Sequence, residues 1–221
     1  QFMLHKIYSL NENFKNYFNN YDFHNLYKEL LNFCTVDLSA FYFDIRKDSL
    51  YCDSKDSKKR QSTIILLNVI LNSLLRWLAP ILSFTTEEIY RLIMNDNKSI
   101  HLTKFLEFPI SFKNENLNHK WLELIKIRNI CNISIEEKRA SKEIGSSLEA
   151  NLKINLDKKL NEISKDIDFS ELCITSNAEV SYLENTETKV QTSKAEGSKC
   201  QVCWKITNKT CSRKTCPKSI E

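Results

Sequence analysis

The sequence predicts a mainly α protein, in which a helical bundle is followed by a small α+β unit and a cysteine-rich tail. Apolar residues recur at helical spacing through most of the chain before Gly145, and strict alternation of apolar and polar residues begins after it. Four of the eight cysteines lie between Gly197 and Glu221. With 221 residues, 42% of them hydrophobic, the chain can bury a sizeable core.

Three helices are predicted before Pro80. Residues 1 to about 47 carry apolar side chains at helical spacing, interrupted by the polar stretch "NNYDFH", which predicts two helices packed as a hairpin. Residues 62–79 are apolar on most faces, which is typical of a helix inside a bundle. Pro80 should end or kink that helix, because proline lacks the backbone N–H.

The next helix carries a start signal. Thr85 and Glu88 have the spacing of a capping box, and Phe84 and Ile89 that of a hydrophobic staple, so we expect a helix from Thr86. Residues 96–117 show no sustained period and should form a connecting loop.

A further long helix is predicted at 118–143, with Gly145 placed to stop it. Beyond it, alternation from 148 to 156 predicts a half-buried strand, followed by a short helix near 158–165. Strands at "ELCITS" and "EVSYL" would complete the α+β unit, and a polar linker with one central strand would lead to the tail.

Composition excludes several classes of protein. Only two glycines are present, too few for the glycine-rich loops that cradle nucleotide phosphates. No run approaches the roughly 18 apolar residues of a membrane helix, and the start lacks signal-peptide features, so we expect a cytoplasmic protein without a membrane partner. Gln1, with Met3 inside a helical pattern, suggests a piece of a longer chain.

Four scattered cysteines should be small buried hydrophobes: Cys34, Cys52, Cys131 and Cys173.

The positive charge is concentrated in the tail. The net charge of the chain is +4, but residues 194–221 hold seven basic and two acidic side chains, so the rest of the chain has a net charge of −1. A local basic patch suits a polyanion, although charge alone would also fit an ordinary solvated surface.

The tail cysteines have the spacing of a zinc site. Cys200 and Cys203 form C-x2-C, and Cys211 and Cys216 form C-x4-C. Four thiolates would fill a tetrahedral coordination sphere, so the ion would be structural, and metal binding could fold a segment with few apolar residues. A redox pair, a disulfide or free thiols are the alternatives, but no thioredoxin-like pattern surrounds Cys200.

Trp204 directly follows the first cysteine pair. Its ring could pack over the metal site, or it could stack on an unpaired nucleic-acid base beside the basic patch. The local sequence favours neither role.

Four stretches occur together in the order seen in bacterial-type isoleucyl-tRNA synthetases. They are "DLSAFYFDIRKDSLYCD" (37–53), "LAPILSFTTEEIY" (78–90), "IGSSLEANL" (144–152) and "KCQVCW" (199–204), and the resemblance covers nearly the whole chain. It implies an anticodon-binding helical bundle at 1–95, truncated at its start, a connecting loop at 96–117, a C-terminal junction at 118–190, and a zinc-binding tail at 191–221.

The resemblance also implies a partner and a parent enzyme. The partner would be isoleucine tRNA, bound at its anticodon stem-loop, with Trp204 holding a base and the tail lysines Lys199 and Lys205 near phosphates. The parent would attach isoleucine to tRNA with ATP, using upstream catalytic and editing domains. The second cysteine pair, Cys211 and Cys216, departs from the family's usual pattern, because it is C-x4-C where the family usually has C-x2-C.

This segment alone should be non-catalytic. None of its four histidines lies in a His-x-Gly-His motif, and "DSKKR" at 56–60 is not the Lys-Met-Ser-Lys-Ser loop. On the bundle, Arg46 and Lys47 are candidate RNA contacts, or else a surface pair that balances Asp44 and Asp48. The alternative function is a free-standing, zinc-containing helical adaptor that binds protein or RNA; a redox protein using Cys200 and Cys203 is a third hypothesis.

Overall fold

The computed structural model describes residues 1–94, 98–182 and 188–208. The chain divides into two compact units. The first contains residues 1–42 and 58–118, and the second contains 43–57 and the chain from 119 onward. The predicted domain boundaries stay a prediction; the structure groups 43–57 with the later unit.

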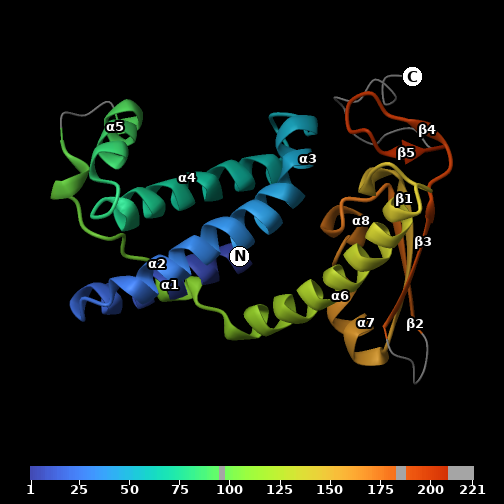
Figure 1. The fold of residues 1–221 in the computed structure, drawn as a ribbon, viewed down its shortest axis with the longest axis horizontal. Helices are drawn as coiled ribbons and strands as arrows, with labels where there is room; N and C mark the ends of the chain where they lie inside the picture. Colours follow the sequence, from blue (N-terminus) through green and yellow to red (C-terminus); the bar gives the residue numbers. More distant parts are fainter. Residues whose placement is uncertain (95–97, 183–187, 209–221) are drawn as a thin grey trace. The chain divides into compact units, whose positions relative to one another are not determined.

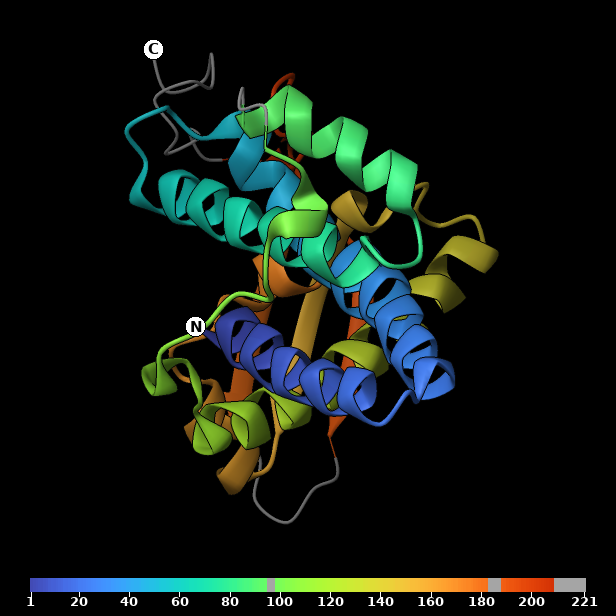
Figure 2. The same cartoon turned by 90° about the vertical axis from the view of Figure 1, so that its left-hand side faces the viewer.

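The first unit is helical (Figure 1). Its elements are α1 (Phe2–Asn19), α2 (Phe23–Asn32), most of the π-helical stretch η1 (Phe33–Phe43), α4 (Lys58–Leu78), α5 (Ser83–Met94), and the short 3-10 turns η2 (Ile100–Leu102) and η3 (Ile110–Phe112). The side chain of Asp22 caps α2 by accepting from Asn25 N. Helices α1 and α2 pack together, which confirms the predicted hairpin, and α4 lies beside α5 (Figure 2).

The core of this unit surrounds Trp77. Its ring is fully buried, makes an edge contact with Phe14 at 4.9 Å between centroids, and donates from Nε1 to Asn11 Oδ1 at 3.0 Å. Asn11 in turn donates to the carbonyl of Leu106. The buried polar atoms are therefore satisfied inside an aromatic core.

Helix α4 is long and apolar enough to cross a membrane by length and composition alone. Such a helix is weak evidence for a membrane span, because the core helix of a soluble domain passes the same test. Here α4 carries Trp77 and packs on α1 and α5.

The second unit is a three-stranded sheet with helices packed against it. Its elements are α3 (Asp44–Cys52), most of α6 (Glu115–Ala140), η4 (Ser147–Glu149), β1 (Ala150–Leu156), α7 (Lys158–Ser164), α8 (Phe169–Leu172), β2 (Asn177–Tyr182), β3 (Lys189–Lys194), β4 (Ser198–Lys199) and β5 (Ile206–Thr207). The strand order is β2-β1-β3, with β1 parallel to β2 and antiparallel to β3.

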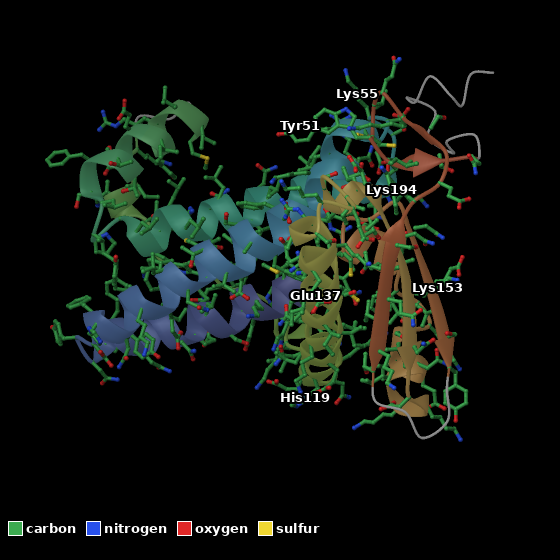
Figure 3. All side chains as sticks on the ribbon, turned by 45° about the vertical axis from the view of Figure 1, so that its right-hand side comes forward. Tyr51, Lys55, His119, Glu137, Lys153 and Lys194 are labelled. Atoms are coloured by element: carbon green, nitrogen blue, oxygen red, sulfur yellow. The ribbon has the colours of Figure 1, made fainter. Side chains whose placement is uncertain are left out.

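Alternation along β1 sets which face of this sheet is buried. Leu152, Ile154 and Leu156 have no exposed surface, while Lys153 between them points to solvent, away from α6 (Figure 3). The Oγ atoms of Ser134 in α6 and Thr192 in β3 lie 2.8 Å apart on the covered side. The predicted strand, the short helix after it, the strand at "EVSYL" and the strand in the linker are confirmed.

Three local predictions are wrong. Helix α5 begins at Ser83, before the predicted start at Thr86, and Thr86 Oγ1 donates to Leu82 O instead of lying at a capped end. Helix α6 ends at Ala140, because Lys142 adopts a left-handed φ of 59° and turns the chain before Gly145. The segment "ELCITS" is the end of α8 and a turn, since the carboxylate of Asp168 caps a helix there.

Candidate nucleic-acid interface

The start of the cysteine tail folds as a small hairpin, which we call the knuckle (residues 198–207). Strands β4 and β5 pair antiparallel, with Ser198 opposite Thr207. Within the turn, Cys200 N donates to Lys205 O at 2.9 Å and Trp204 N to Cys200 O at 3.0 Å. Trp204 takes a left-handed φ of 62°, which few non-glycine residues adopt.

Cys200 and Cys203 are buried at the centre of the knuckle, with 0% and 8% of their surface exposed. Val202 N donates to Cys200 Sγ at 3.4 Å. A backbone N–H directed at sulfur favours the thiolate, the form that binds zinc. The residues therefore fit half of a thiolate site. Cys211 and Cys216 lie outside the described residues, and within the described ranges no group of three or more potential ligands is close enough to hold a metal.

Sequence reasoning missed Cys52 as a neighbour of the knuckle. Cys52 is buried in one cluster with Cys200 and Cys203, against Val202, and its thiol donates to Val202 O at 3.6 Å. The expectation of a small buried side chain is confirmed for Cys52, Cys131 and Cys173, whereas Cys34 is partly exposed. No local signal could indicate this contact, because 150 residues separate its two partners.

Other hydrogen bonds fix the knuckle to the α+β unit. Ser176 Oγ accepts from Ile206 N at 2.6 Å and donates to the carbonyl of Leu148. Lys205 Nζ lies 3.4 Å from Ser170 Oγ. The knuckle is thus held by Ser176, just before β2, and by Ser170 in α8, so its exposed side chains have a defined position in this unit.

A cavity of about 400 Å³ opens where α3, α8 and the knuckle meet. Helix α3 contributes Asp44, Lys47, Asp48 and Tyr51, which share one helix face. The remaining walls are mainly α8 with the turn after it, and the knuckle from Val202 to Lys205. The cavity combines two aromatic rings with charges of both signs.

Trp204 lies on this cavity with 59% of its surface exposed. Lys199 Nζ is 5.5 Å from the centre of its ring, a cation–π distance. A large part of the ring therefore remains accessible to a ligand.

The two charged candidates on α3 both have acidic neighbours. Arg46 Nη1 lies 2.7 Å from Glu171 Oε1, and both side chains are partly buried. Lys47 Nζ lies 3.2 Å from Asp44 Oδ1 and is 63% exposed. Arg46 thus connects α3 to α8, while Lys47 presents its ammonium to solvent beside the cavity. Contact of either residue with RNA stays a prediction.

Asp168 stabilises the helix that carries one wall of the cavity. Its Oδ1 accepts from Ser170 Oγ at 2.7 Å and from the backbone N–H groups of Ser170 and Glu171. Burial acts to raise the pKa of this carboxyl, but these hydrogen bonds and the nearby Lys205 ammonium outweigh it and hold the pKa below its usual value. Asp168 is therefore ionised at neutral pH.

Comparison with known proteins identifies the family. Residues 1–155 match the model of the anticodon-binding domain of tRNA ligase. The chain belongs to this anticodon-binding family. The match ends before the knuckle, so the cavity includes residues of the anticodon-binding domain on α3 and residues beyond it on α8 and the knuckle.

Curated relatives extend the similarity over almost the whole chain. The isoleucine--tRNA ligase of Pelagibacter ubique is 67% identical over 96% of this chain, and those of Agrobacterium fabrum and Gluconobacter oxydans are 38% and 35% identical over 93% of it. The chain spans about a quarter of the length of these relatives, at their C-terminal part. This similarity does not favour a free-standing adaptor.

Proposed function

We propose that this anticodon-binding domain recognises isoleucine tRNA as the C-terminal part of an isoleucine--tRNA ligase. In the parent protein, upstream catalytic and editing domains would use ATP to attach isoleucine to the tRNA in the cytoplasm. The observation that carries the proposal is the half-exposed Trp204, placed beside lysines on a knuckle that is fixed to the α+β unit.

The roles that we propose for the individual side chains follow from RNA chemistry. Lys199, Lys205 and Lys47 would bind phosphates, which gives affinity that falls with salt but little base selectivity. Trp204 would stack on an unpaired anticodon base, because single-stranded loops present their bases to aromatic side chains. Arg46 would form part of the protein surface that contacts RNA while it remains paired with Glu171.

We propose one structural zinc ion for the tail, held by Cys200, Cys203, Cys211 and Cys216. When bound, the ion would supply folding free energy and no reactive position, because four thiolates fill its coordination sphere. The burial of Cys200 and Cys203 and the N–H directed at Cys200 Sγ support this proposal.

The test is a filter-binding titration of the zinc-supplied chain. Isoleucine tRNA should bind more tightly than the same tRNA with a substituted first anticodon base, by about 1–3 kcal/mol, and Trp204→Ala should remove most of that difference. Tyr27→Ala, which removes an exposed aromatic ring from α2, is the matched control. Equal binding of isoleucine tRNA and an unrelated tRNA at moderate salt would contradict the proposal.

A further inference from the structure

We propose that Cys52 and Cys203 form a redox-sensitive pair, which a hydroperoxide converts into a disulfide between α3 and the knuckle. The inference goes beyond tRNA recognition. It rests on the proposed function only where it concerns zinc, because Cys203 is one of the four proposed thiolate ligands.

Three thiols from two distant parts of the chain pack together at the knuckle. Cys52, at the end of α3, is buried in one cluster with Cys200 and Cys203, and 7%, 0% and 8% of their surfaces are exposed. All six cysteines that the structure describes carry reduced thiols. A buried cysteine often acts only as a small hydrophobic side chain. Cys52 differs in that its thiol is directed at the backbone of the C-x2-C turn.

The polar contacts of Val202 indicate which knuckle cysteine Cys52 can reach. Cys52 Sγ lies 3.6 Å from Val202 O, and this oxygen belongs to the peptide group that joins Val202 to Cys203. Val202 N, in the preceding peptide group, donates to Cys200 Sγ at 3.4 Å. A disulfide spans only about 4.4–6.8 Å between Cα atoms. A sulfur that contacts the peptide group of Cys203 therefore favours Cys203 as its partner over Cys200.

The cavity beside the knuckle gives a small oxidant access to this pair. Cys52 and Cys203 both line the cavity of about 400 Å³, whereas Cys200 has no exposed surface. Thiol oxidation follows exposure, and redox-sensing cysteines often have a second thiol beside them that resolves the first oxidation product. Cys203 is thus the accessible sulfur of the C-x2-C pair, and Cys52 is placed to resolve it.

The oxidation takes two steps. In the first, the Cys203 sulfur attacks the hydroperoxide, the O–O bond breaks and an S–O bond forms; the peroxide takes up the thiol proton and leaves as an alcohol, or as water from hydrogen peroxide. In the second, the Cys52 sulfur attacks the sulfenic acid of Cys203, the S–O bond breaks, and water leaves with the Cys52 proton. The two thiols together lose two electrons, which the peroxide gains.

The disulfide has two consequences for the tail. It removes Cys203 from the proposed set of four thiolate ligands, so the affinity for zinc falls. It also links the first turn of the knuckle covalently to α3. A dithiol reverses both effects, because thiol–disulfide exchange restores the two thiols. The turn therefore stays in place until reduction and zinc restore the complete site.

The experiment treats the full chain with hydrogen peroxide in two preparations, one supplied with zinc and one stripped with a chelator. Mass spectrometry of unreduced peptides identifies the disulfides. Trypsin cleaves after lysine, so Cys52 lies in peptide 48–55 and both cysteines of the turn lie in peptide 200–205. We expect these two peptides to be joined, with fragmentation locating the link at Cys203. In the zinc-supplied preparation, a chromophoric indicator should report zinc release that increases with the linked fraction.

Cys52→Ser tests the resolving role, because serine keeps a small polar side chain but cannot form a disulfide. In this variant the link should be lost, and Cys203 should remain a sulfenic acid that dimedone labels. Prolonged peroxide should then oxidise Cys203 irreversibly, so dithiothreitol should restore zinc binding in wild type but not in the variant. Cys34→Ser removes a partly exposed cysteine from the other unit, and this matched control should behave as wild type.

The outcomes distinguish this inference from the proposed function. If wild type forms a disulfide inside peptide 200–205, or one from Cys203 to Cys211 or Cys216, and Cys52→Ser behaves as wild type, the pairing is wrong and the proposed function stands. Oxidation of Cys203 without any disulfide at Cys52 would also overturn it. If the link forms in a chain that binds no zinc, the redox pair is supported and the zinc proposal fails.

Discussion

Gly197, at the entrance to the knuckle, is the residue whose identity is most constrained by local geometry. Its φ is +127°, a conformation that side chains disfavour, and an added Cβ would lie 2.4 Å from the carbonyl carbon of Thr207. The backbone at residue 197 therefore lies too close to β5 to leave room for a side chain. Gly145 is different, because a Cβ there would meet only the Glu149 carboxylate at 3.4 Å.

Replacing Gly197 with alanine should open the knuckle. We expect Gly197→Ala to destabilise the β4–β5 pair by at least about 1 kcal/mol, since both the strained φ and the overlap with β5 must be relieved. Zinc affinity, measured by competition with a chromophoric chelator, should fall accordingly, and Gly145→Ala should retain wild-type affinity. Equal affinities for both variants would show that the knuckle does not depend on this close approach.

Among the elements of the second unit, α3 and α8 are joined by Arg46 and Glu171. This pair is partly buried, and Arg128 adds a hydrogen bond from Nε to the carbonyl of Leu172 at the end of α8. Lys47, on the same helix as Arg46, makes an exposed pair with Asp44 instead. Exposed pairs contribute little to stability, whereas removing one partner of a buried pair leaves a charge unsatisfied.

We expect Arg46→Ala to lower the free energy of unfolding by about 1–3 kcal/mol and Lys47→Ala to change it by less than about 0.5 kcal/mol. Urea titration followed by circular dichroism measures both. A neutral Arg46→Ala variant would mean that α8 is held to α3 by other contacts.

Acid should act on α8 through its capping carboxylate. Because the folded-state pKa of Asp168 lies below the unfolded value, its ionised form stabilises the folded state above the unfolded pKa of about 3.9, and this contribution is lost as pH falls through the folded pKa. Asp168→Ala should therefore lower the melting temperature at pH 7 and show a smaller further loss between pH 5 and 3 than wild type. An equal loss of melting temperature between pH 5 and 3 in wild type and Asp168→Ala would exclude a stabilising role for the ionised Asp168 carboxylate.

Across the part of the molecule that the structure describes, two pairs of cysteines differ in environment. Cys200 and Cys203 lie in the knuckle, while Cys131 and Cys173 lie inside the α+β unit. A hydrogen bond with the Cys131 side chain, together with burial, raises the pKa of the Cys173 thiol well above its usual range. A thiol in that state is a poor nucleophile, whereas zinc thiolates become reactive once the metal is removed.

Chelation should therefore change alkylation at the proposed zinc ligands and not at Cys131 or Cys173. With the proposed zinc bound, we expect iodoacetamide to leave Cys200 and Cys203 unlabelled, and with a chelator added we expect both to be labelled. Cys131 and Cys173 should stay unlabelled under either condition while the unit is folded, and peptide mass spectrometry identifies each site. Labelling of Cys200 and Cys203 at the same rate with and without chelator would argue against the zinc proposal.

Predictions from the sequence succeeded where the signal spans a few residues. The alternation at Leu152 and Ile154 predicted β1, and the spacing of Cys200 and Cys203 predicted a pair that the structure buries together. The capping box at Thr85 failed because the same threonine-rich pattern also suits a helix interior, where the hydroxyl of Thr86 bonds to the preceding turn. The pairing of Arg46 with Glu171 could not be predicted, since 125 residues separate them.

Periodicity and spacing along the chain were sufficient to predict the helical bundle, the buried face of β1, the cysteine pair and the ordered motifs that mark the family, because each of these signals is local. The three-dimensional packing was needed to show that Cys52 supports the knuckle, that Arg46 is paired, and that Tyr51 and Trp204 share one cavity. These contacts join α3, α8 and the knuckle, and the folding of the unit brings together segments that no local pattern relates.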